Sequence, residues 1–176
     1  MSLILLGLIQ GLTEFFPVSS SGHLVIAKYF LKLNLPGAAF EAFVHFGTVM
    51  AVIVLFRKEI KELAISFFDS IYKIFQGENI LNILKNNLIS KLAWFLVIST
   101  IPAAIIGYTF SSYFEILFSK PIIASFMLFI TGALLWFGNK SYSEGNKNIS
   151  EITCKDAIFI GLAQAVAIIP GISRSG

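Results

Sequence analysis

The sequence is poor in charge. Lys, Arg, Asp and Glu together make up 13% of its 176 residues, whereas a soluble domain usually carries about 25% charged residues. Hydrophobic residues reach 56%, with 18 phenylalanines, and a water-soluble chain of this size cannot bury so much apolar surface. The composition therefore excludes an ordinary soluble enzyme. It also excludes disorder, which requires low hydrophobicity and high net charge. We expect an all-α polytopic membrane protein.

Cysteine and early positive charge are equally scarce. A single cysteine, Cys154, forms neither an internal disulfide nor a cysteine zinc site. The first positive residue is Lys28, so the apolar start Ser2–Phe16 lacks the basic region of a secretory signal peptide, and we expect it to be retained. The net charge of +3 is spread over many loops and gives no reason to expect nucleic acid as a partner.

Three apolar segments have the length of a membrane span. Eighteen helical residues rise roughly 27 Å, which is close to the ~30 Å hydrocarbon core of a bilayer. The three segments are Phe40–Phe56, Leu92–Phe110 and Pro121–Gly138. We predict a membrane-spanning helix for each.

Two further apolar segments, Leu3–Phe16 and Ala157–Ile169, are shorter, and each is followed by a proline and a small polar cluster. Backbone turns at membrane depth are tolerated only inside protein or beside a water-filled cavity. Half-helices that end in such turns build polar sites near the bilayer midplane. We therefore predict two re-entrant short helices.

The two short segments also resemble each other, which indicates an internal duplication; the alternative is chance similarity between apolar, Ser/Gly-rich stretches. At a separation of 154 residues, Gly7, Leu8, Gln10, Ser19, Ser21 and Gly22 match Gly161, Leu162, Gln164, Ser173, Ser175 and Gly176. We interpret residues 1–176 as one integral membrane domain, with a first motif half at 3–33 and a second at 157–176.

Loop charge gives an orientation. Positive residues gather in Arg57–Lys91 and Asn139–Asp156, whereas Ser111–Lys120 holds only Lys120. The positive-inside rule places the first two loops in the cytoplasm. The two short segments then enter the membrane from opposite faces, as in the inverted repeats of many transporter folds. Within Lys58–Lys91, apolar residues at helical spacing predict an amphipathic helix on the inner surface.

Ionisable residues in the apolar segments mark the chemistry. Gln10 and Glu14 are four residues apart and share one helix face, and an ionisable residue at membrane depth is a functional candidate by default. The alternative for Glu14 is capping by the neighbouring serines or snorkelling to the interface. Glu41 lies at the outer end of a span, where snorkelling is easier. His45, on an apolar face, is expected to be a packing residue.

Ser19-Ser20-Ser21-Gly22-His23 follows the first short segment. A serine close to a histidine can act as a nucleophile with its base, which makes Ser20 and His23 candidates. Alternatively, the serines form the N-cap of a helix over Leu24–Leu33.

The second polar turn has the character of a phosphate site. It reads Pro170-Gly171-Ile172-Ser173-Arg174-Ser175-Gly176. Consecutive amides with small hydroxyls form an anion-binding nest, glycine lets the backbone approach a ligand, and Arg174 adds a planar fork suited to phosphate oxygens. The alternative is an ion pair of a buried Arg174 with Glu14 or Glu41. A carboxylate beside a phosphate nest also favours Mg²⁺ or Ca²⁺, and the combination points to phosphoryl hydrolysis on a substrate with a lipid tail.

These stretches resemble the two signatures of the bacterial undecaprenyl-diphosphate phosphatases, the bacitracin-resistance family. Gly7–Leu24 is similar to the first signature, in which Glu or Gln, three residues and Glu precede a Pro-Val-Ser-Ser-x-Gly-His turn. Pro170–Gly176 is similar to the second, Pro-Gly-x-Ser-Arg-Ser-Gly. Phe40-Glu41 before a long apolar span also fits the family.

The resemblance implies a multi-pass protein of the bacterial plasma (inner) membrane with an inverted-repeat helical bundle. It implies hydrolysis of undecaprenyl diphosphate with a divalent cation, which recycles the lipid carrier for cell-wall synthesis and confers bacitracin resistance. By motif position, Gln10 and Glu14 would lie at the metal and Ser20 or His23 would be the nucleophile or acid/base. The phosphates would be held by Ser19, Gly171, Ser173, Arg174 and Ser175.

The chain departs from the family in two respects. The family continues past its second signature through further helices, so we expect the second repeat to be incomplete here. Gln10 stands where many members have Glu. The competing hypothesis is a membrane transporter or flippase for a lipid phosphate or ion, because inverted repeats and broken helices are common in transporters. The expected partners are a polyprenyl diphosphate lipid and membrane lipids, and the sequence leaves the oligomeric state open.

Overall fold

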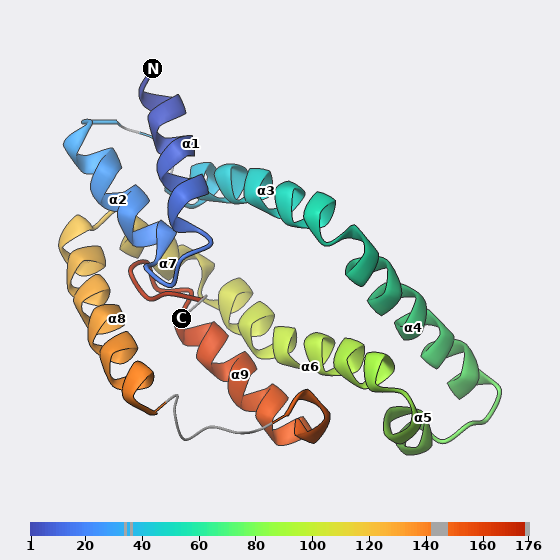
Figure 1. Ribbon diagram of the computed structural model, residues 1–176. Helices are drawn as coiled ribbons and strands as arrows, with labels where there is room; N and C mark the ends of the chain where they lie inside the picture. The colour runs from blue at the N-terminus through green and yellow to red at the C-terminus, as the bar shows by residue number, and fades with distance from the viewer. Residues whose placement is uncertain (34, 36, 142–147, 175–176) are drawn as a thin grey trace.

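The computed structural model describes residues 1–33, 35, 37–141 and 148–174, and in these ranges the chain is helical, with no β-strand (Figure 1). The helices are α1 (Ser2–Thr13), α2 (Ser20–Phe30), α3 (Gly37–Leu55), α4 (Arg57–Phe75), α5 (Ile80–Asn86), α6 (Leu88–Thr109), α7 (Ser111–Phe118), α8 (Pro121–Ser141) and α9 (Cys154–Val166), with a 3₁₀ turn at Ile149–Glu151. The all-α prediction is confirmed.

Two of the predicted spans are single helices. α6 and α8 are each long and apolar enough to cross a bilayer, and α6 begins four residues before the predicted Leu92. The predicted span Phe40–Phe56 is found as α3, but it meets the same test only together with α4, across an 85° bend. The described residues thus hold two candidate spans, or three if the bent pair is one. The chain is a helical membrane protein.

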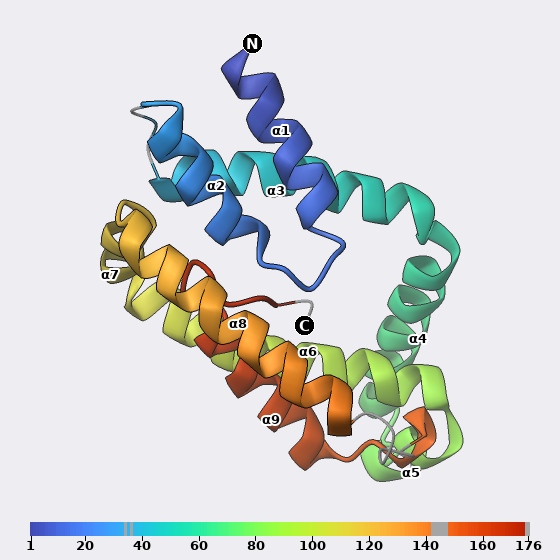
Figure 2. The same cartoon turned by 60° about the vertical axis from the view of Figure 1, so that its left-hand side comes forward.

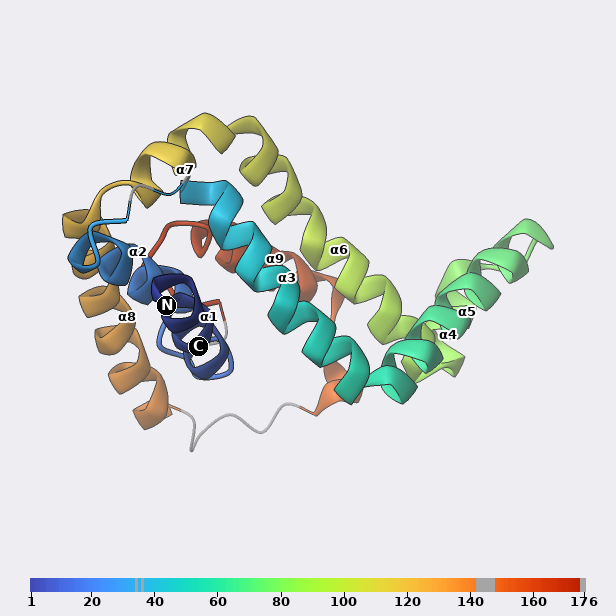
Figure 3. The same cartoon turned by 90° about the horizontal axis from the view of Figure 1, so that it is seen from above.

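The predicted amphipathic segment forms α4 and α5, which extend away from the other helices (Figure 3). α4 packs against α6, and a 2.7 Å hydrogen bond between the buried Ser66 and Ser90 hydroxyls joins the two helices. The Phe67 ring also contacts Trp94, with centroids 5.0 Å apart. Elsewhere α4 exposes large apolar side chains such as Phe68, Tyr72 and Phe75 together with charged ones.

The two predicted short helices are α1 and α9, and the C-terminal ends of α1 and α9 approach each other from opposite sides (Figures 1 and 2). α9 lies along α6. A Cβ at Gly161 of α9 would lie 2.4 Å from the carbonyl oxygen of Ser99, so only glycine allows this approach of the two backbones.

Two local predictions differ in extent. The helix expected over Leu24–Leu33 already begins at Ser20, with Ser19 as its N-cap.

The link Ser111–Lys120, expected as a connection, contains α7. Phe118 of α7 packs with Val25 of α2 and Ala124 of α8 in a small buried cluster, so burial of an aromatic side chain orders this link.

Candidate active site

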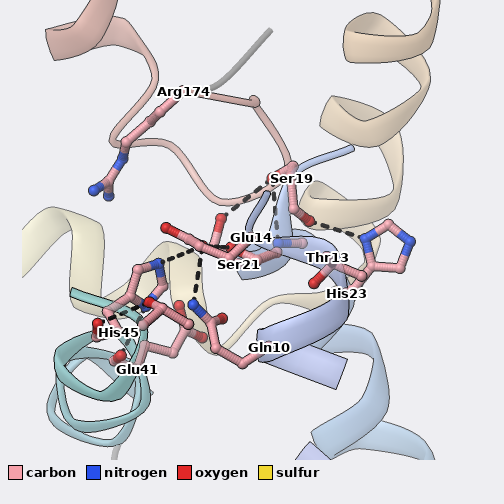
Figure 4. A network of polar contacts seen from close by, with 12 residues as sticks. Gln10, Thr13, Glu14, Ser19, Ser21, His23, Glu41, His45 and Arg174 are labelled. Atoms are coloured by element: carbon pink, nitrogen blue, oxygen red, sulfur yellow. Dashed lines mark hydrogen bonds and ion pairs between the residues drawn. The ribbon is translucent and has the colours of Figure 1, made fainter. Parts of the chain in front are cut away.

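The two polar turns enclose one cavity of about 50 Å³. The first turn and the following helix contribute Glu14, Ser19, Ser20 and Ser21, α3 contributes His45, and the second turn contributes Ile172, Ser173 and Arg174. Figure 4 shows the polar contacts of this cluster. Residues more than 150 positions apart in the sequence therefore share one polar hollow, as the two motifs predict.

Hydrogen bonds hold the second turn against the first turn and α8. The Ser19 hydroxyl donates to the Ile172 carbonyl oxygen at 3.2 Å. Thr131 of α8 donates from Oγ1 to the Gly171 carbonyl oxygen at 2.7 Å and accepts from the Ser173 amide at 3.2 Å. Since Thr131 is 4% exposed, these bonds are shielded from water and fix the turn firmly.

Gly171 allows the second turn to lie close to α8. Its φ of +100° is in the region that favours glycine, and an added Cβ would lie 2.4 Å from the carbonyl oxygen of Ala124. On its other side Gly171 contacts Gly22, where an added Cβ would lie 2.8 Å from the Gly171 Cα. The separation of the two turns is thus set by two glycines in contact.

We expect Gly171→Ala to lower the free energy of unfolding by about 2–4 kcal/mol, because backbone strain and a clash with α8 act together. The measurement is the thermal unfolding midpoint of the purified protein in detergent. Gly132→Ala is the matched control, since an added Cβ there has open space around it and alanine favours the helix. Equal midpoints for parent and Gly171→Ala would contradict the packing described here.

The Glu14 carboxylate is the centre of the polar cluster. Its Oε2 accepts from Gln10 Nε2 at 2.9 Å and from the Ser20 hydroxyl in a short hydrogen bond, and it lies 3.3 Å from His45 Nε2. Its Oε1 contacts no donor within the described ranges. One oxygen therefore faces the serine, and the other is available to a ligand.

The structure brings many of the predicted site residues together. Glu14, Ser19, Ser20, Ser173 and Arg174 all line the cavity. Gln10 lies behind Glu14 and is 1% exposed. Ser175, also predicted as a phosphate ligand, lies outside the described residues.

His23 and Gly171 do not line this cavity. His23 Nδ1 lies 2.9 Å from the Ser19 carbonyl oxygen, and the ring is on the far side of the turn from Glu14 (Figure 4). The Ser20 hydroxyl is bonded to Glu14 and not to His23, so of these two side chains Glu14 is the one placed to accept the serine proton.

Glu41 is buried, so snorkelling does not describe it. Its Oε1 accepts from Lys28 Nζ at 3.0 Å, with side-chain exposures of 4% and 8%. Burial of both partners explains why the pair forms, because an unpaired charge in this place would be costly.

Arg174 is exposed, contrary to the expectation of a buried arginine, and has no carboxylate partner in the described part of the chain. Its Nε donates to the Ala167 carbonyl oxygen at 3.3 Å, and Arg174 is one of the residues that line the cavity. Two amides of the predicted nest are already used, since Ile172 donates to Ile169 and Ser173 donates to Thr131. These two amides are therefore not available to an anion in the cavity.

Sequence reasoning missed two residues of this site, His45 and Thr131. His45 was expected to pack, yet its ring lines the cavity and contacts Glu14. Thr131 fixes the second turn. The available signal was weak: each is one polar side chain within a long apolar segment, and polar residues at that depth are costly unless paired.

The residues around Glu14 fit a divalent cation bound through few protein ligands. Gln10 Oε1 is buried and has no hydrogen-bond partner among the described residues. In the same ranges no group of three His, Cys, Asp or Glu side chains is placed to form a complete metal site. Mg²⁺ commonly takes one or two protein oxygens and completes its shell with substrate phosphates and water.

The sequence also matches known proteins along nearly its whole length. The family model described as bacitracin resistance protein BacA matches residues 3–176. The chain is 41% identical to the undecaprenyl-diphosphatase of Desulforapulum autotrophicum, 42% to that of Syntrophotalea carbinolica and 39% to that of Methanobrevibacter smithii. Each alignment covers 98% of this chain and 61–62% of the relative, so the chain spans about three fifths of the length of these relatives.

Proposed function

We propose that this chain, which belongs to the bacitracin resistance protein BacA family, hydrolyses undecaprenyl diphosphate to undecaprenyl phosphate and inorganic phosphate. This reaction would return the lipid carrier to cell-wall synthesis and lower sensitivity to bacitracin. The observation that carries the proposal is the single cavity in which Glu14, Ser20 and Arg174 meet. A carboxylate, a hydroxyl and a free cation are the groups that phosphoryl transfer through a serine requires.

In the proposed reaction the Ser20 oxygen attacks the terminal phosphorus. A bond forms between Ser20 Oγ and phosphorus, the anhydride P–O bond breaks, and undecaprenyl phosphate leaves with the bond electrons. The proton of the Ser20 hydroxyl passes to Glu14 Oε2, with which it already shares a hydrogen bond. Glu14 then gives this proton to the departing undecaprenyl phosphate. As a carboxylate again, it takes a proton from a water molecule that attacks the phosphoserine. The bond between Ser20 Oγ and phosphorus breaks, inorganic phosphate leaves, and Glu14 returns the proton to Ser20.

The phosphate groups would be held by Arg174 together with the hydroxyls of Ser19 and Ser173. Arg174 supports this role because it lines the cavity and has no carboxylate partner within the described ranges. A guanidinium matches two phosphate oxygens at once. His23 would act indirectly. Its ring is hydrogen-bonded to the Ser19 carbonyl oxygen and would thereby hold the Ser19–Ser20 turn in place.

A divalent cation, Mg²⁺ or Ca²⁺, would be held by Glu14 Oε1, with Gln10 as the second oxygen ligand. When bound, it would neutralise negative charge on the diphosphate. The small number of protein ligands favours Mg²⁺ over Ca²⁺, which takes six to eight oxygens.

The finer architecture belongs to the same proposal: an inverted repeat of 3–33 and 157–176 within one domain, with re-entrant α1 and α9 in a multi-pass plasma-membrane protein. It is supported by the opposed approach of α1 and α9 and by the matching turns, which meet at Gly22 and Gly171. Orientation by loop charge puts α4 and α5 on the cytoplasmic side. Glu41, although outside the cavity lining, would support the site through its ion pair with Lys28.

The test is phosphate release from undecaprenyl diphosphate by the purified protein in detergent, with Mg²⁺ and with a chelator. We expect one phosphate per substrate, with turnover lost on chelation and restored by added Mg²⁺. If no phosphate is released but the lipid moves between the leaflets of proteoliposomes, the transporter hypothesis would be favoured over the hydrolase. The result counts as positive only if the turnover is well above that of the Ser20→Ala variant purified in parallel.

A further inference from the structure

His45 holds the Glu14 carboxylate from α3, an element outside both motif turns. Its Nε2 lies 3.3 Å from Glu14 Oε2, and the side chain is 22% exposed at the wall of the cavity. The other ring nitrogen, Nδ1, lies 2.8 Å from the carbonyl oxygen of Glu41, one helical turn earlier. Because a carbonyl oxygen only accepts, Nδ1 is the donor in this bond. Nε2 therefore attracts the Glu14 carboxylate in the protonated imidazolium, in which both ring nitrogens carry hydrogen.

The imidazole is thus fixed at both ends. The bond from Nδ1 sets the plane of the ring, and Nε2 then points at Glu14 (Figure 4). The main chain carrying His45 is bonded in turn by Thr48, whose hydroxyl donates to the His45 carbonyl oxygen at 2.8 Å. Such anchoring is what a group that orients another side chain requires.

α3 is itself tied to the helix that carries the serine. Lys28 of α2 and Glu41 of α3 form a buried ion pair with 3.0 Å between Nζ and Oε1. Ser20 begins the same helix α2. The contacts therefore close a circuit from Ser20 through Glu14, His45, Glu41 and Lys28 back to α2.

We infer that His45 is a positioning residue that keeps Glu14 Oε2 aligned with the Ser20 hydroxyl. This inference rests on the proposed function, in which Oε2 receives the serine proton. The terminal torsion of a glutamate is broad, so removal of one of the three contacts at Oε2 frees the carboxylate to rotate away from Ser20. A purely packing role would not require a polar contact to the one carboxylate of the cavity.

Steady-state kinetics on a prenyl diphosphate test the effect. We expect His45→Leu to lower kcat by about 10–100-fold with KM changed by less than about 3-fold, because the loss concerns alignment and not substrate binding. His45→Gln keeps an N–H donor near the Nε2 position and should recover kcat to within about 5-fold of the parent. Phe46→Leu, the next residue on α3 and 61% exposed, is the matched control and should leave kcat unchanged.

A double-mutant cycle separates positioning from packing. If His45 acts through Glu14, His45→Leu should change the rate by less than about 2-fold in a Glu14→Ala background. Independent, multiplicative losses would overturn the inference, as would failure of His45→Gln to recover any rate.

A second readout does not depend on prenyl diphosphate hydrolysis. An alkyl fluorophosphonate forms a bond from Ser20 Oγ to phosphorus and expels fluoride, while the serine proton passes to Glu14. We expect mass spectrometry to find the label on Ser20, with labelling about 10-fold slower in His45→Leu. Slower labelling without hydrolysis of undecaprenyl diphosphate would refute the proposed function and leave His45 in its role. Labelling at the parent rate in His45→Leu, or no labelling of Ser20 in the parent, would overturn the inference.

Discussion

Replacement of Ser20 by alanine is expected to lower kcat by at least roughly 10³-fold, the largest effect we expect from one substitution. The reason is chemical: the Ser20 hydroxyl is bonded directly to Glu14 Oε2 and lines the cavity, and in the proposed reaction it supplies the oxygen that attacks phosphorus. The fold should be retained, because Glu14 Oε2 keeps its contacts with Gln10 and His45. Rapid-quench measurement of phosphate release, with the unfolding midpoint as a check on folding, gives the result.

Ser21→Ala is the matched control for Ser20→Ala. Ser21 lines the same cavity, but its hydroxyl contacts Ser19 at 3.3 Å and not Glu14, so we expect a loss of less than about 10-fold.

The stability of the trapped intermediate decides between serine and histidine as nucleophile. A phosphoserine survives acid and is cleaved by alkali, whereas a phosphohistidine does the opposite. An acid-labile intermediate, or Ser20→Ala with a tenth of parental turnover, would remove Ser20 from its role.

The helices of the membrane part follow from the sequence, because length and hydropathy are local properties of a segment. α6 and α8 are predicted by uncharged runs of the right length. The 85° bend between α3 and α4 is not predicted by any helix breaker, since Phe56 adopts a non-helical φ of −102° without proline or glycine beside it. The one signal is the change from apolar residues to charge at Arg57. Packing of α4 on α6 then decides the direction.

The candidate site is predictable where a motif carries its own chemistry. Glu14, Ser20 and Arg174 lie in stretches whose residue types already indicate phosphate chemistry, and the structure places them at one cavity. His45 is different, because nothing near it in the sequence is unusual. Its place depends on the register of α3 against α2, which the buried pair of Lys28 and Glu41 fixes. A contact that depends on the packing of two helices is not encoded in the spacing of either one.

The same limit applies to the amides of the second turn. Small residues around Ser173 predict a nest of donors, but Thr131, 42 positions earlier, takes the Ser173 amide and the Gly171 carbonyl. A hydroxyl in the middle of an apolar helix gives no indication of which turn it will bind. Tertiary contact thus engages an amide that the motif alone would leave to a ligand.

Arg174→Ala is expected to lower kcat/KM by about 10²–10³-fold, because a preorganised guanidinium stabilises the charge that develops on the transferring phosphoryl group. The loss should appear in both KM and kcat, since the same fork binds the diphosphate in the ground state. Arg174→Lys keeps the charge but loses the two-pronged geometry and should lie between parent and alanine. Initial rates over a range of prenyl diphosphate concentrations separate the two constants.

The fold of Arg174→Ala should be nearly unaffected, which makes its kinetic loss interpretable. The Arg174 side chain is exposed and gives up one 3.3 Å bond from Nε to Ala167, while its carbonyl oxygen still accepts from Gln164. Arg57→Ala, at the only other arginine of the sequence, is the matched control and should retain parental kcat/KM because Arg57 lies on α4, outside the cavity. If both alanine variants lost activity equally, general loss of positive charge would explain the result. A selective loss at Arg174 is expected only if its guanidinium holds the phosphate beside Ser20 and Glu14.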